Sequence, residues 1–124
     1  MNLPSGHQTV MPYFIAHSPE ALINFARDTF KATVTQQHLR PDGGIMHAEI
    51  IIGNNTLMIG GANKDWPART CDLFIYVDNA DECFHKAVEQ GAEVVMEVAD
   101  KDYGRSGGVK DTNGNIWWIT SLPE

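Results

Sequence analysis

Residues 12–34, PYFIAHSPEALINFARDTFKATV, and residues 72–94, DLFIYVDNADECFHKAVEQGAEV, show the same succession of strand, helix and strand patterns. Residue identity survives between the two stretches, about 60 positions apart: Phe14-Ile15 recurs as Phe74-Ile75, and the Ala-x-Val triplet of 32–34 recurs at 92–94. The chain is therefore predicted to consist of two copies of one structural unit.

Each copy contains one amphipathic helix with a recognisable beginning. Ser18-Pro19 provides an N-cap hydroxyl and a proline in the first turn, and Asp78 or Asn79 caps the second helix. Apolar residues then follow at i, i+3, i+4, i+7 and i+8, which predicts one buried face on each helix. These faces comprise Leu22, Phe25, Ala26, Thr29 and Phe30, and Ala80, Cys83, Phe84, Ala87 and Val88.

Short β-branched runs separated by Gly, Asn and Asp predict the remaining strands. The order is β-α-β-β-β, repeated once, which indicates an α+β domain over residues 1–124, with modules of about 9–61 and 71–121. Residues 100–108 are expected to form a long loop, which is either a lid or an ordinary hairpin connection. Seven of the eight predicted strands are 9–17, 33–40, 45–52, 56–59, 72–77, 93–98 and 116–121, and the eighth leads through Val109 into the hairpin turn at 111–114.

The composition excludes several functional classes. Nine Lys and Arg oppose sixteen Asp and Glu, so the formal net charge is −7, which argues against nucleic acids and anionic membranes as partners. The longest apolar run is too short to span a bilayer, and no targeting segment is expected. Cys71 and Cys83 lie on different predicted elements and are expected to be reduced, which favours a cytoplasmic location.

Three stretches resemble the vicinal oxygen chelate superfamily, which includes glyoxalase I, bleomycin-resistance and fosfomycin-resistance proteins and extradiol dioxygenases. They are residues 12–30, residues 43–53 (GGIMHAEIIIG) and residues 103–120 (YGRSGGVKDTNGNIWWIT), and they are most similar to its PhnB-like branch. The resemblance implies two βαβββ modules that form an incomplete barrel, the glyoxalase-like fold, around a cup.

The resemblance also implies four metal-ligand positions in metal-dependent members. In this sequence they fall on Met11, on Ile59 or Gly61, on Asp72 and on Trp118. Only Asp72 carries a suitable donor, whereas a divalent cation requires several donors that converge on it. We therefore expect no catalytic metal and no other cofactor.

Strand alternation then predicts the lining of the cup, with the implied ligand positions as anchors. Among the inward residues, those expected to bind a ligand are Met11, Tyr13, His47, Glu49, Asp72, Phe74, Tyr76 and Trp118. Trp117 is expected to pack against a helix instead. The pair His47 and Glu49 forms either an acid–base pair or a solvated strand face. Histidines 7, 17, 38 and 85 are expected at the surface.

An aromatic lining favours a small-molecule binding protein, because ligand pockets combine apolar walls with a few polar groups. A metal-dependent lyase, isomerase or dioxygenase that uses His47, Glu49 and Asp72 is the first alternative. A non-catalytic association module, with the cup filled by side chains, is the second. Exposed sheet edges and a half-open cup further predict a homodimer.

Overall fold

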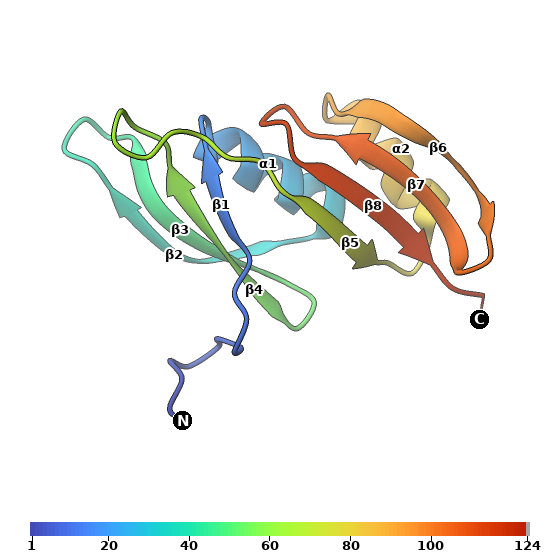
Figure 1. Ribbon diagram of the computed structural model, residues 1–124, viewed down its shortest axis with the longest axis horizontal. Helices are drawn as coiled ribbons and strands as arrows, with labels where there is room; N and C mark the ends of the chain where they lie inside the picture. Colours follow the sequence, from blue (N-terminus) through green and yellow to red (C-terminus); the bar gives the residue numbers. More distant parts are fainter. Residues whose placement is uncertain (124) are drawn as a thin grey trace.

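The computed structural model describes residues 1–123, which form two four-stranded sheets and two helices (Figure 1). Figure 1 shows the two sheets side by side, with both helices behind them. The elements are β1 (Tyr13–Ala16), α1 (Pro19–Phe30), β2 (Thr33–Leu39), β3 (Ile45–Ile52), β4 (Asn55–Gly61), β5 (Asp72–Tyr76), α2 (Ala80–Glu89), β6 (Glu93–Lys101), β7 (Gly104–Lys110) and β8 (Ile116–Ser121).

The two sheets have the same topology. Their strand orders are β1-β4-β3-β2 and β5-β8-β7-β6, in which the first pair of each sheet is parallel and the other pairs are antiparallel. Neither sheet closes into a barrel. The predicted α+β class and the duplicated βαβββ unit are confirmed.

Both helices begin where the sequence predicts. The Ser18 hydroxyl accepts a hydrogen bond from the backbone N–H of Ala21, and Asn79, rather than Asp78, accepts from Glu82. Each helix buries its apolar stripe against its own sheet, except that Val88 at the end of the second stripe is exposed. The two helices also contact each other.

One hydrophobic core therefore joins the two modules on the helix side of the sheets. Trp117 on β8 lies at its centre, with 1% of its surface exposed. Its ring stacks on Phe14 of β1 at 5.8 Å and lies 4.9 Å from the ring of Phe30 on α1. A residue of the second module thus packs mainly on aromatic residues of the first.

The turn between β7 and β8 joins the modules through polar contacts. Asn113 donates from its side chain to the Ser18 carbonyl and accepts from the Ser18 N–H, both at 2.9 Å. Asn115 accepts from the N–H of Cys71 at 3.1 Å. Both amides are buried, so these bonds fix the start of α1 and the linker before β5 relative to the same turn.

The prediction of a long loop over residues 100–108 is wrong. β6 continues to Lys101, and β7 begins at Gly104, so that only a tight turn separates the strands. Gly107 and Gly108 gave the stretch the composition of a loop, yet each lies in the strand because a large side chain covers it. A Cβ atom at Gly107 would lie 2.9 Å from the Phe84 ring.

The strand predicted over residues 9–17 is shorter, because only Tyr13–Ala16 pairs with β4. The strand predicted at 56–59 instead runs from Asn55 to Gly61.

Cys83 is buried, and burial raises the pKa of its thiol to about 11. Within residues 1–123, no helix is long and apolar enough to cross a bilayer.

The two adjacent tryptophans test this arrangement of faces. Trp117→Ala should lower the free energy of unfolding by about 3–5 kcal/mol, because it empties the junction between the modules. Trp118→Ala should cost clearly less, because its ring lies on the helix-free face. Urea denaturation of both variants measures the difference. Equal losses would contradict the assignment of the two rings to opposite faces.

Candidate functional site

The sheet faces opposite the helices carry the residues that the sequence placed in the cup. Tyr13, Phe74 and Tyr76 are 56%, 50% and 65% exposed, whereas the alternate residues of the same strands pack toward the helices. We call the helix-free side of β1-β4-β3-β2 the first face and that of β5-β8-β7-β6 the second face. Within positions 1–123, each hydrogen bond or ring contact of a candidate residue joins two residues of the same face and does not connect the two faces.

Tyr13 is paired with Met58 on β4, and its ring extends over Gly60, two residues further along β4, which has no side chain. A Cβ atom at Gly60 would lie 3.0 Å from the Tyr13 hydroxyl and 3.1 Å from its ring. The other edge of the tyrosine ring approaches His47, with the two rings perpendicular and their centroids 6.2 Å apart. The glycine thus allows an aromatic side chain to cover the sheet beside an imidazole.

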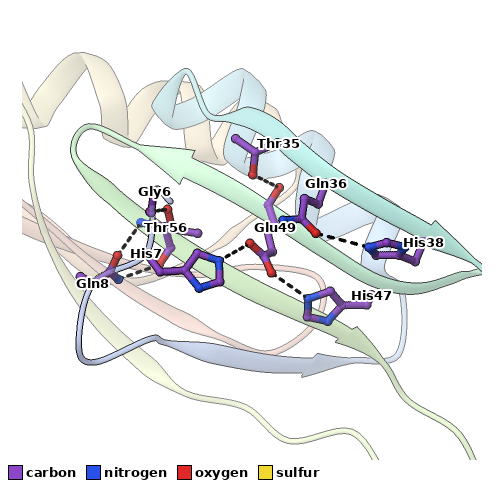
Figure 2. A network of polar contacts seen from close by, with 9 residues as sticks. All are labelled: Gly6, His7, Gln8, Thr35, Gln36, His38, His47, Glu49 and Thr56. Atoms are coloured by element: carbon purple, nitrogen blue, oxygen red, sulfur yellow. Dashed lines mark hydrogen bonds and ion pairs between the residues drawn. The ribbon is translucent and has the colours of Figure 1, made fainter. Parts of the chain in front are cut away.

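Glu49 is the buried polar centre of the first face, with 4% of its surface exposed. Its two carboxylate oxygens accept from different histidines: Nε2 of His7 at 2.7 Å and Nε2 of His47 at 3.1 Å (Figure 2). Figure 2 shows that His7 arrives from the N-terminal segment, whereas His47 lies on the same strand as Glu49. The pairing of His47 with Glu49 is one of the two alternatives that the sequence left open, whereas His7 was not predicted as a partner.

The N-terminal segment is held on this face by more than His7. The Gln8 side chain donates to the Thr56 carbonyl at 2.8 Å and accepts from the Thr56 N–H at 3.2 Å. The Thr56 hydroxyl in turn donates to the Gly6 carbonyl. A small cavity of about 210 Å³ lies under the segment, with His7 and Glu49 in its wall.

The expectation that His7 is a surface residue is therefore wrong. Burial alone would raise the pKa of Glu49, but hydrogen bonds from His7 and His47 outweigh it, and the pKa of this carboxyl is lowered. Glu49 is thus ionised at neutral pH although it is buried. Hydrogen bonds from the two histidines compensate the desolvation of the Glu49 carboxylate. Because Glu49 is buried, the alternative in which His47 and Glu49 form a solvated strand face does not hold.

Trp118 occupies the second face as Tyr13 occupies the first. A Cβ atom at Gly108 would lie 2.6 Å from Cζ3 of the Trp118 ring, so the ring rests directly on the glycine. The indole Nε1 donates to the Asp72 carboxylate at 3.2 Å across the parallel β5–β8 pair. Asp72 and Trp118 are therefore brought together, whereas Asp72 belongs to a different face from His47 and Glu49.

Phe74 is the centre of an aromatic group on the second face. Its ring meets Tyr76 at 5.4 Å and Tyr103 at 5.8 Å, both edge-to-face. Tyr103 lies in the β6–β7 turn and was not predicted as a wall residue. Arg105 next to it is held by two bonds to Asp81, of 2.6 and 3.0 Å, so it anchors β7 to α2.

The four positions implied by metal-dependent relatives do not fit a metal ion. Met11, Ile59, Gly61 and Trp118 offer no hard oxygen or imidazole donor, and the Asp72 carboxylate accepts from Trp118. Across residues 1–123, no three His, Cys, Asp or Glu side chains are grouped so that they could hold a metal ion.

A separate crevice of about 730 Å³ opens between the modules on the helix side. Its walls come from the end of α1, the first turns of α2, the β3–β4 turn and the free edge of β5. Of the candidate residues, only Phe74 and Tyr76 line it. The crevice is therefore not the cup that the sequence predicted.

Comparison with known proteins identifies the family. The Glyoxalase/Bleomycin resistance protein/Dioxygenase superfamily matches residues 8–119. The chain therefore belongs to this superfamily, the vicinal oxygen chelate proteins, as the sequence patterns predicted. A search of curated proteins gives no significant match.

Solved structures show the same fold at low sequence identity. TioX from Micromonospora sp. ML1 is 22% identical, with a TM-score of 0.72 over 94% of this chain and 98% of that one. A PhnB protein from Bacillus cereus is 17% identical, with a TM-score of 0.71 over 93% of this chain and 100% of that one. TnmS3, an antibiotic binding protein from Streptomyces sp. CB03234, is 14% identical, with a TM-score of 0.67 over 94% and 100%.

Acid should release the N-terminal segment from the first face. The lowered pKa of Glu49 means that its contribution to stability is complete above the ordinary glutamate pKa and is lost as the pH falls through the lowered value. The protection factor of the Thr56 amide against hydrogen exchange, which reflects its bond to Gln8, should therefore fall between neutral pH and pH 3. Glu49→Gln should reduce this fall, and an unchanged pH profile of the protection factor in that variant would contradict the role of Glu49 in holding the N-terminal segment.

Proposed function

We propose that this protein binds a planar, mostly apolar small molecule on its helix-free sheet faces, without catalysis. The observation that carries the proposal is that large aromatic side chains stay exposed on these faces, at positions where a polar side chain would be better solvated. A contiguous exposed group of large aromatic side chains on a folded domain usually marks an interaction site, and Phe74, Tyr76 and Tyr103 form such a group. Tyr13 and Trp118 each cover a glycine of the adjacent strand, which leaves their rings as walls for a planar ligand.

A few polar groups on the same faces can orient a ligand. They are the imidazole of His47, supported by Glu49, and the carboxylate of Asp72, which accepts from Trp118. This mixture of aromatic walls and isolated polar groups is typical of small-molecule sites. The description of TnmS3 as an antibiotic binding protein, for a chain of the same fold, supports the same class of ligand.

The binding proposal includes the absence of a catalytic metal, because only one of the four family positions, Asp72, carries a suitable donor. The protein purified without chelator should retain less than about 0.2 equivalents of Zn, Ni, Mn or Fe after dialysis. A stoichiometric metal would favour the lyase or isomerase alternative instead, with His47, Glu49 and Asp72 as the first residues to mutate.

Fluorescence of Trp118 tests the binding site directly. Planar bicyclic aromatics, such as naphthalene and quinoline derivatives, should quench the protein's tryptophan emission at saturable concentrations. The quenching should be lost in Trp118→Ala and weakened in Gly108→Ala, whose Cβ would displace the ring. Trp66→Phe is the matched control, because Trp66 is also exposed but lies in the linker between the modules.

Retention of the full quenching in Trp118→Ala would place the ligand elsewhere. Absence of quenching by every compound would favour the association module.

We further propose that two chains pair so that each flanks the exposed faces of the other, beside the proposed ligand site. One chain packs its modules through the helix side, so both aromatic faces and the outer edge of β5 remain uncovered. A second copy would flank these faces most simply by two-fold symmetry.

Light scattering at tens of micromolar should therefore give a species of twice the 13.7 kDa chain mass. A charge on the second face, as in Phe74→Asp, should shift the protein toward the monomer. A 13.7 kDa species in the unmodified protein would contradict the pairing.

A further inference from the structure

The protonation of the Glu49 network determines what His47 can offer a ligand. A buried ionised carboxylate only accepts hydrogen bonds, so both imidazole nitrogens that contact Glu49 must carry hydrogen. The Nε2 atom of His47 is therefore committed as a donor. In the neutral ring, the remaining nitrogen, Nδ1, is then an acceptor with a free lone pair.

This acceptor is available on the first face. The ring of His47 makes no other hydrogen bond within residues 1–123, and 24% of its side chain is exposed. The carboxylate on the opposite nitrogen stabilises the charge that the ring acquires when Nδ1 takes a proton. The arrangement of a buried carboxylate and an imidazole with one open nitrogen is that of a supported proton acceptor.

The groups around His47 are an aromatic side chain, a second imidazole and the Glu49 carboxylate with its own histidine partner. Tyr13 from β1 meets its ring edge-to-face at 6.2 Å, and the His38 ring from β2 lies 6.2 Å away. Glu49 on the same strand is its charged neighbour, and His7 from the N-terminal segment reaches that carboxylate from the other side. His7 therefore acts as a positioning residue that holds Glu49 in place.

We infer that His47 determines specificity, and that the site selects a planar aromatic ligand that carries an acidic hydroxyl group. This inference rests on the proposed binding function. On binding, the hydroxyl O–H bond breaks, its electron pair stays on the ligand oxygen, and the proton forms an N–H bond at Nδ1 of His47. Glu49 balances the resulting imidazolium, so no further reactant is required.

The charge of the protein favours this class over a permanent anion. A ligand that is already ionised would approach a chain with a formal charge of −7 and would meet the Glu49 carboxylate. A phenolic ligand arrives neutral and transfers its proton only within the site. The complex then gains a short-range ion pair without long-range repulsion.

The pair 4-nitrophenol and 4-nitroanisole tests the inference, because the two probes share a ring and differ in the hydroxyl hydrogen. Equilibrium dialysis should show at least about 10-fold tighter binding of 4-nitrophenol, which corresponds to about 1.4 kcal/mol. The bound 4-nitrophenol should also show the phenolate absorbance at a pH where the free probe is mainly protonated.

Histidine variants on and off the first face provide the test. His47→Gln should abolish both the preference and the phenolate signal, whereas His85→Gln should leave them unchanged, because His85 is exposed on α2, away from the first face. Glu49→Gln keeps the shape of the side chain and should remove the phenolate signal while 4-nitroanisole binds as before. Thermal unfolding confirms that each variant is folded.

The outcomes separate this inference from the proposed function. If 4-nitroanisole binds as tightly as 4-nitrophenol, or if the phenolate signal survives in His47→Gln, the inference is wrong and the binding function stands. If neither probe binds and no aromatic compound quenches Trp118, the binding function itself fails.

Discussion

The arrangement of the two modules depends on the hydrogen bonds that the buried carboxylate of Asp111 accepts. It accepts from the backbone N–H groups of Asn113 and Asn115, at 2.9 and 3.0 Å, and from the indole of Trp117 at 2.9 Å. The first two bonds shape the turn whose amides hold Ser18 and the linker before β5. The third fixes the tryptophan around which the aromatic residues of the first module pack. Since a buried N–H without a partner costs about 1–3 kcal/mol, one side chain supports both the polar and the apolar junction.

A core on the helix side has a direct consequence for the opposite faces. The large apolar side chains that fill the junction come from alternate strand positions, so their neighbours must point away from it. Gly60 and Gly108 then determine how these neighbours lie. Because neither glycine has a Cβ atom, Tyr13 and Trp118 can rest on the backbone of the adjacent strand instead of standing upright. Two aromatic walls thus arise at different places in the two modules, Tyr13 on the first strand of one and Trp118 on the last strand of the other. The first wall lies beside a histidine and a glutamate, and the second lies beside an aspartate.

The sequence predicted the parts of this structure that depend on local periodicity. Strand alternation separated Trp117 from Trp118, and helix spacing identified the buried stripes, because both signals repeat within a few residues. It failed where distant segments decide the outcome. Residues 100–108 resemble a loop in composition, but Phe84 and Trp118 cover the adjacent glycines and make a strand favourable. His7 was assigned to the surface because its partner, Glu49, is 42 positions away along the chain. Whether the cup lining predicted by alternation binds a ligand stays a prediction.

The two faces differ in the polar groups that they present to a bound ligand. On the second face, Asp72 already accepts from the Trp118 indole, so that carboxylate and ring stabilise each other and present mainly an apolar wall. On the first face, the Glu49 carboxylate is buried beneath the imidazoles of His7 and His47, and it acts on a ligand through the partly exposed ring of His47. A buried charge that acts through a histidine can respond to the protonation state of a ligand, whereas an exposed one is screened by water and salt. The duplication of one βαβββ unit has therefore produced two aromatic faces, of which only the first couples an aromatic wall to a supported proton acceptor.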